Sequence, residues 1–164
     1  ETNGGDGSVD TTNAPNSITL TGSDTDTFNS IVTDYTIVAP GNGIVSFDWD
    51  YTTNDVDTPE FDPFIRLLNG VGTQLTNDGG SVTQQGTDSF AVNAGDTFGF
   101  RIDAIDDQLG NAFVTISSFE GPGRDSTPVP FETEGAMGLV AIGGYLGYRR
   151  LKKRKQTLIE NADS

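Results

Sequence analysis

The chain has 164 residues, of which 24 are acidic and nine are basic, so its net charge is −15. It contains no cysteine and no histidine, which excludes disulfide bonds, thiolate zinc sites and catalysis by a histidine base. An acidic surface of this size repels phosphate, so nucleic acid is not an expected partner.

The charge is divided unevenly along the chain. Residues 1–134 carry 22 acidic and three basic side chains, a net charge of −19, whereas residues 135–164 carry a net charge of +4. The chain therefore has an acidic N-terminal part and a short basic C-terminal part, and these are expected to have different surroundings.

The first 16 residues contain Gly, Asn, Thr and Asp with almost no apolar side chain to bury. This composition predicts a flexible N-terminal arm over residues 1–16, which could become ordered on a protein partner. The chain begins with Glu1 and not with Met, as expected after removal of a secretory signal.

Residues 17–121 have the pattern of a β-sandwich. Short runs rich in Val, Ile, Phe, Tyr and Thr alternate with turns of Gly, Asn, Asp and Pro, which is typical of an all-β domain. Eight such runs predict an antiparallel sandwich of jelly-roll type. The predicted strands are 18–21, 31–39, 44–52, 64–68, 73–76, 88–92, 97–104 and 112–119.

Alternation along these strands predicts which side chains form the core. In the run 44–51, Phe47, Trp49 and Tyr51 share one face, while Asp48 and Asp50 share the other. Val45 is expected to face outward. The predicted core residues are Phe47, Trp49, Phe64, Leu67, Phe90, Val92, Phe98, Phe100, Ile102 and Ile116.

Acidic residues gather after the third predicted strand, at Asp55, Asp57, Glu60 and Asp62. Calcium binds six to eight oxygen ligands of this kind, although the spacing departs from that of an EF-hand loop. The other interpretation is a solvated acidic loop on an acidic protein. Calcium is the one cofactor that the sequence suggests.

The sequence gives little support for catalysis. Paired carboxylates can hydrolyse glycosides, but the separation that this mechanism needs cannot be obtained from a sequence. No phosphate loop, dinucleotide fingerprint or metalloprotease motif is present. We therefore expect a binding protein and not an enzyme.

The C-terminal part predicts a membrane anchor. Residues 122–130 form a linker rich in Pro and Gly, and fourteen uncharged residues follow at 135–148. Extended to residues 131–151, the apolar run approaches the length of a membrane span. Basic residues at its end place the tail, residues 152–164, in the cytoplasm and the sandwich outside it. They are Arg149, Arg150, Lys152, Lys153, Arg154 and Lys155.

Small residues recur within the predicted span. Ala136, Gly143 and Gly147 are spaced to lie on one face of a helix, where they would allow a second membrane helix to approach closely. The alternative is chance spacing within a glycine-rich run. The first interpretation predicts a protein partner in the membrane.

A resemblance to a known family rests on the same C-terminal residues. Val129-Pro130-Phe131-Glu132, the apolar span and the basic residues after it resemble the PEP-CTERM class of sorting and anchoring tails, in its cyanobacterial PFE variant. Segments 45–53, 61–64 and 90–100 are similar to the exported domains that carry such tails. The resemblance implies export and anchoring, at the cell surface, in the periplasm or in the thylakoid lumen.

Two functions are consistent with these features. The first is a membrane-anchored, non-catalytic β-sandwich that acts in protein binding or assembly, as an accessory subunit of a membrane complex. The alternative is a cell-surface or extracellular-matrix module that binds polysaccharide or envelope proteins. The expected partners are thus the membrane, proteins that contact the span and the N-terminal arm, and a polysaccharide.

Overall fold

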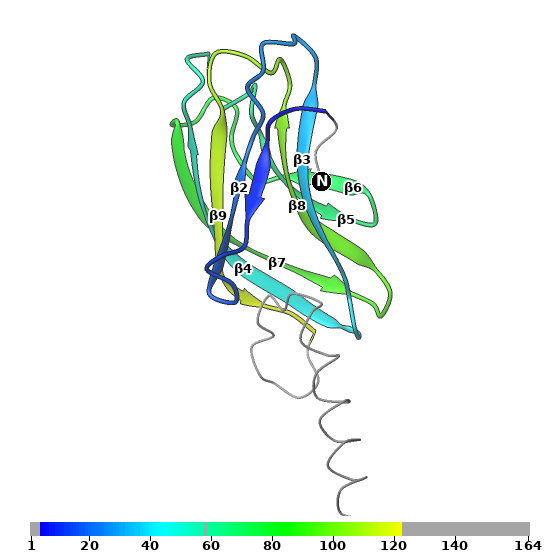
Figure 1. Ribbon diagram of the computed structural model, residues 1–164. Coiled ribbons are helices and arrows are strands. Elements are labelled where there is room, and N and C mark those ends of the chain that lie inside the picture. Colours follow the sequence, from blue (N-terminus) through cyan, green and yellow to red (C-terminus); the bar gives the residue numbers. More distant parts are fainter. Residues whose placement is uncertain (1–3, 58, 123–164) are drawn as a thin grey trace, which may run out of the picture. The chain divides into compact units, whose positions relative to one another are not determined.

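The computed structural model describes residues 4–57 and 59–122, which form a sandwich of two antiparallel sheets (Figure 1). One sheet has the strand order β1-β2-β9-β4-β7, and the other has the order β3-β8-β5-β6. The strands are β1 Ser8–Asp10, β2 Ser17–Thr21, β3 Ile31–Val38, β4 Gly43–Thr53, β5 Phe64–Leu68, β6 Val71–Gln74, β7 Thr83–Val92, β8 Thr97–Ala104 and β9 Ala112–Glu120.

The strand pairing is nested around the β5–β6 hairpin. From that hairpin outward, β4 pairs with β7, β3 with β8 and β2 with β9. Together these pairs form one long antiparallel ribbon. The ribbon folds over itself, so that β4 also pairs with β9, and β5 also pairs with β8. This is the winding of a jelly roll, and it confirms the predicted antiparallel sandwich.

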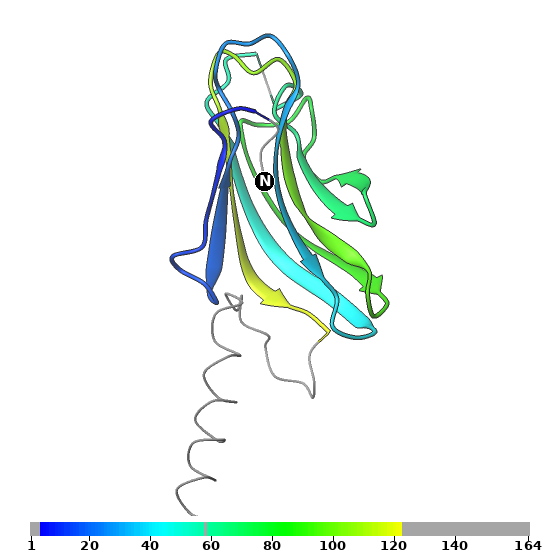
Figure 2. The same ribbon diagram turned by 45° about the vertical axis from the view of Figure 1, so that its right-hand side comes forward.

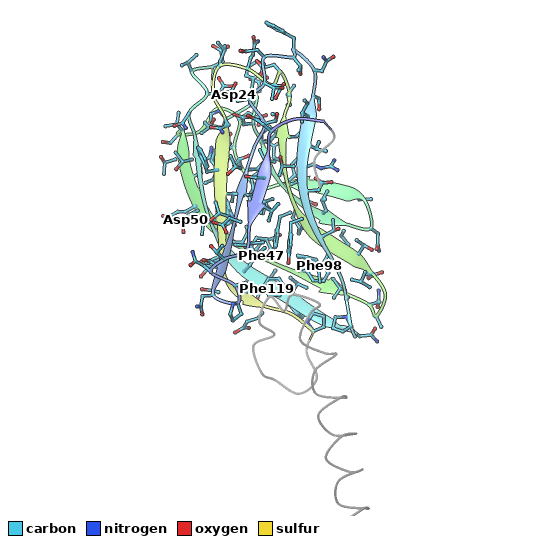
Figure 3. The ribbon with its side chains drawn as sticks, in the orientation of Figure 1. Asp24, Phe47, Asp50, Phe98 and Phe119 are labelled. Atoms are coloured by element: carbon cyan, nitrogen blue, oxygen red, sulfur yellow. The ribbon has the colours of Figure 1, made fainter. Side chains whose placement is uncertain are left out.

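The core lies between the two sheets and is rich in aromatic rings. Along β4, Val45, Phe47, Trp49 and Tyr51 are all buried, because every second side chain points inward. Each large apolar side chain that is fully buried contributes about 1.5–3 kcal/mol to stability. Phe47, Phe98 and Phe119 can be followed between the sheets in Figure 3.

Most of the predicted core is confirmed. Of the predicted residues, all but Phe90 are buried, and Phe90 is half-buried against the core. The prediction that Val45 faces outward is wrong, since its side chain is completely buried. It lies on the same face of β4 as Phe47, as strict alternation requires.

Most of the predicted N-terminal arm belongs to the sandwich. Ser8–Asp10 form β1, which pairs with β2 in the register Val9↔Leu20, and Val9 and Ala14 pack against the core. Asp6 Oδ1 also accepts hydrogen bonds from Ser23 Oγ at 3.2 Å and Asp24 N at 2.9 Å. The prediction of a flexible arm is therefore wrong from Asp6 onward. Backbone hydrogen bonds to β2 hold this segment, and they do not require apolar side chains.

Two strands near the sandwich edge also differ from prediction. β7 begins at Thr83 and not at residue 88, and its first half pairs with β4 as far as Thr83↔Thr52. β6 begins at Val71, directly after the turn at Asn69 and Gly70, both of which have positive φ. Two adjacent left-handed residues are what a two-residue hairpin turn requires.

The connections β2–β3, β4–β5 and β8–β9 gather at one end of the sandwich, shown at the top of Figures 1 and 2. We call this the loop end. Within residues 4–57 and 59–122, no helix is long and apolar enough to cross a membrane. The predicted span 131–151, the tail 152–164 and all but Pro122 of the linker lie outside the described residues.

Candidate functional site

The outer face of the five-stranded sheet is strongly polar. Because Phe47 and Trp49 point into the core, Ser46, Asp48 and Asp50 of β4 point away from it. Figure 3 labels Asp50 on this sheet. The face therefore presents hydroxyl and carboxylate groups to solvent, and it has a hydrophobic layer directly beneath it.

A β-bulge interrupts this face between β4 and β9. Ser46 is paired with Glu120 and Asp48 with Ser117, so Ser118 and Phe119 together oppose Phe47. Ser118 has φ of 49°, in the left-handed region that serine rarely occupies. Bulges and such strained residues are concentrated at functional sites.

A groove of ≈ 530 Å³ lies over the bulge. Its outward side chains form two rows. In the first row, Glu120 of β9, Ser46 of β4 and Ser89 of β7 lie side by side. In the second row, Asp48 of β4 lies beside Thr87 of β7. The groove is thus lined mainly by groups that form hydrogen bonds. The full lining is Ser46, Phe47, Asp48, Thr87, Asp88, Ser89, Ser118 and Glu120.

The groove is negatively charged. No lysine or arginine lines it, and the basic residues of the described ranges, Arg66 and Arg101, lie on the other sheet. Arg101 pairs with Asp34 through contacts of 2.7 and 2.6 Å. Arg66 lies 3.0 Å from Asp88, measured from Nε to Oδ2. The groove can therefore donate and accept hydrogen bonds, but it repels anions.

The residues predicted to hold calcium differ in their exposure to solvent. Asp55 and Asp62 are buried, whereas Asp57 and Glu60 are exposed. In the described part of the chain, no three acidic side chains stand together as a ready-made metal centre. Calcium binding by Asp55, Asp57, Glu60 and Asp62 stays a prediction.

Asp62 has an unusual environment for a carboxylate. Burial raises its pKa to about 7, and the neighbouring charges of Asp55, Asp106 and Asp24 act in the same direction. Its Oδ2 accepts a hydrogen bond from Thr53 Oγ1 at 3.0 Å, which partly offsets the rise. The side chain is therefore held close to core residues, where a proton makes its burial less costly.

The groove residues were largely missed by the sequence prediction. Alternation identifies Asp48 and Asp50 as outward-facing, but Ser46 meets Glu120 only because β4 pairs with β9. Polar residues at alternate positions of β4 and β9 do indicate a polar outer face on these strands. The bulge that shapes the groove has no such signal.

Several predicted site residues cannot be placed. The small residues Ala136, Gly143 and Gly147 lie outside the described residues, as does the basic cluster at 149–155. The membrane topology and helix packing that they suggest stay predictions.

Comparison with known proteins gives likenesses of fold only. No family model and no curated protein matches the chain. A native family 35 carbohydrate-binding module from Clostridium thermocellum is 12% identical, over 70% of this chain and 81% of that one, with a TM-score of 0.36. The CBM35 of Abf62 from Cellvibrio japonicus is 13% identical over 62% and 77% of the two chains, with a TM-score of 0.36.

A third structure is the C-terminal CBM6 of LamC, a marine laminarinase from Zobellia galactanivorans, 15% identical over 72% and 91% of the two chains, with a TM-score of 0.37. Identities below 25% concern fold alone, and these TM-scores are below 0.5.

Proposed function

We propose that this protein is a non-catalytic binding module and that its groove on the five-stranded sheet binds a neutral polysaccharide. The observation that carries the proposal is the lining of the groove, in which three carboxylates, Asp48, Asp88 and Glu120, stand among serine and threonine hydroxyls. Asp88 is paired with Arg66, which leaves Asp48 and Glu120 as the acceptors. Sugar hydroxyls both donate and accept hydrogen bonds, and carboxylates are strong acceptors for them. An open polar face built on rigid strands suits such a ligand.

The charge of the groove restricts the kind of polysaccharide. Asp48 and Glu120 carry negative charges that no basic residue of the described chain offsets at the groove. Uronate-rich and sulfated chains would place further negative charge beside them. We therefore propose a glycan without acidic groups. Affinity is expected to be weak, with Kd of about 0.1–1 mM, because hydrogen bonds exposed to water contribute little net energy.

Affinity electrophoresis of the full chain through gels that contain soluble polysaccharides tests this proposal. Neutral glucans and mannans are expected to retard it, while alginate and heparin are not. Asp48→Ala and Glu120→Ala should each weaken binding by about tenfold. The matched control is Asp50→Ala, which removes an exposed carboxylate from the same strand and face but outside the groove lining. Retardation that survives both groove substitutions would refute the proposed site.

We also propose that the module is anchored in a membrane by residues 131–151, with the sandwich outside the cytoplasm. The support is the uncharged run 135–148 and the six basic residues that follow it. An accessory role in a membrane complex is the second candidate function, supported by the small residues of the span. Co-purification of a stoichiometric partner after extraction in mild detergent would favour this candidate over the polysaccharide module.

A further inference from the structure

Four large apolar side chains are exposed at the loop end. Phe28 of the β2–β3 connection is 71% exposed, and Val56 of the β4–β5 connection is 77% exposed. Ile105 and Leu109 of the β8–β9 connection are 44% and 48% exposed. Apolar side chains that are exposed one by one are ordinary, but a group of them gathered in one place indicates a contact surface.

Hydrogen bonds hold the β2–β3 connection against the β8–β9 connection. Thr27 Oγ1 donates to Asp107 Oδ2 at 2.6 Å, and Asp26 N donates to Asp107 O at 2.8 Å. Thr27 directly precedes Phe28, and Asp107 lies two residues before Leu109. The exposed side chains of Phe28 and Leu109 are therefore carried by segments that are joined to each other.

The β4–β5 connection lies against the other side of the same segment. A Cβ on Gly110 would be 2.8 Å from the amide nitrogen of Asp55, so the two backbones are in direct contact there. Leu109 directly precedes Gly110, and Val56 directly follows Asp55. Ile105 N also donates to a carbonyl oxygen of the β4–β5 connection at 2.8 Å. All four apolar side chains thus belong to one fastened group of loops.

Two of these exposed side chains stand on strained backbone. Phe28 has φ of 57° and Leu109 has φ of 66°, in the left-handed region that bulky residues rarely occupy. Glycine or asparagine would fit both positions with less strain. The fold does not need the two side chains for its core, because both are exposed. Such strain indicates that they serve a contact outside the chain.

The exposed apolar side chains stand among negative charges. The connections 22–30, 54–63 and 105–111 contain no lysine and no arginine. Figure 3 labels Asp24 at the loop end. A surface of this charge repels a second copy of itself and anionic lipid headgroups, and it attracts cationic groups. The acidic residues of the three connections are Asp24, Asp26, Asp55, Asp57, Glu60, Asp62, Asp106 and Asp107.

We propose that the loop end is a docking surface for a protein segment that has apolar side chains at its centre and lysine or arginine around them. Phe28, Val56 and Leu109 contact the apolar centre, and the exposed carboxylates of Asp26 and Asp57 contact the basic residues. Burial of the apolar side chains supplies most of the affinity, while the opposite charges speed association and select the partner. The groove is lined by residues of β4, β7 and β9, so the two surfaces can be occupied independently.

Selection from a displayed library of random peptides, with the full chain in mild detergent as the target, tests this proposal. Enriched peptides are expected to combine lysine or arginine with aromatic or branched apolar residues. A labelled synthetic peptide of the enriched sequence is then titrated with the chain and followed by fluorescence anisotropy. Its Kd should rise about tenfold between about 0.05 and 0.5 M NaCl, because salt screens the charged groups.

Variants at the strained positions separate binding from folding. Phe28→Asn and Leu109→Asn should each raise Kd by about tenfold or more. Their Tm should equal or exceed that of the wild type, because asparagine tolerates left-handed backbone. Val38→Asn is the matched control, since Val38 is 64% exposed at the far end of β3, and it should bind the peptide as the wild type does. Asp26→Asn combined with Asp57→Asn should reduce the salt dependence of Kd.

Several results would overturn the proposal. Enriched peptides without lysine or arginine would do so, as would equal binding of the peptide by Phe28→Asn. Self-association of the wild type that Phe28→Asn abolishes would assign the surface to a second copy instead. Nuclear Overhauser contacts of Phe28 and Leu109 with detergent acyl chains, with no enriched peptide, would assign it to lipid. Loss of peptide binding in Asp48→Ala would place the peptide in the groove.

Discussion

The guanidinium of Arg66 on β5 joins the two sheets by an ion pair with Asp88 on β7, with 3.0 Å between Nε and Oδ2. The same guanidinium lies over the ring of Phe90, 4.4 Å from the ring centroid, and Nη2 donates to Thr73 Oγ1 at 2.8 Å. Both side chains of the pair are largely buried, with 16% and 20% of their surface exposed. The contact closes the side of the sandwich next to the groove, which Asp88 also lines.

Replacement of Arg66 by methionine is expected to destabilise the fold by about 2–3 kcal/mol. The change leaves Asp88 partly buried without its partner and removes the contact with the Phe90 ring. Urea unfolding measures the loss. The double variant Arg66→Met with Asp88→Asn should recover part of it, since no unpaired charge remains. A loss below about 0.5 kcal/mol in the single variant would show that the pair contributes little, as exposed pairs do.

Stability is expected to fall as the pH rises from about 4 to 7 when no divalent cation is present. Burial, with Asp55, Asp106 and Asp24 nearby, raises the pKa of Asp62 to about 7 in the folded chain, from 3.8 for an ordinary aspartate. The folded state then binds a proton that the unfolded state has released. This bound proton adds about 2–4 kcal/mol to the free energy of unfolding. The contribution is fully present below pH 4 and is lost as the pH rises through 7.

Urea unfolding in EDTA between pH 4.5 and 8 measures this decline. Asp62→Asn keeps the size of the side chain and removes its charge, so its stability should fall much less across the same range. The decline that remains is expected from Asp55, whose pKa is also raised by burial. Asp50→Asn is the control and should show the slope of the wild type. A wild-type stability that is constant or rises with pH would contradict the assignment to Asp62.

Substitution of Gly110 by alanine is expected to cost about 3 kcal/mol or more. The new Cβ would lie 2.6 Å from backbone atoms of Asn54, and alanine also strains the positive φ at this position. Gly70→Ala is the matched control, because Gly70 also has positive φ, +79°, but no atom within 4 Å of its Cβ position. Its cost should be about 1 kcal/mol, from backbone strain alone. Equal costs would show that the contact with Asn54 is unimportant.

The fold could be predicted from the sequence because the core strands alternate cleanly. In β4, Phe47, Trp49 and Tyr51 are separated by single polar residues, so the inward face is unambiguous. The first half of β7 has polar side chains on both faces, since it lies at the sheet edge, and it was missed. β1 was missed because backbone pairing with β2, and not apolar burial, fixes most of it.

The sites were harder to predict because they depend on contacts between distant parts of the chain. Ser46 and Glu120 are neighbours only in the folded sheet, and the bulge beside them has no local sequence signal. The burial of Asp55 and Asp62 is likewise produced by the packing of neighbouring connections. A run of acidic residues predicts solvent exposure unless that packing is known.

Binding of a neutral polysaccharide to the outer face of the five-stranded sheet can be located residue by residue. The isotope-labelled full chain is titrated with an oligosaccharide of the glycan that retards it in gels, and amide chemical shifts are mapped. The largest shifts are expected at Ser46, Asp48, Ser89 and Glu120, with the amides of the loop end unchanged. Shifts confined to the loop end, or none on β4, β7 and β9, would contradict it.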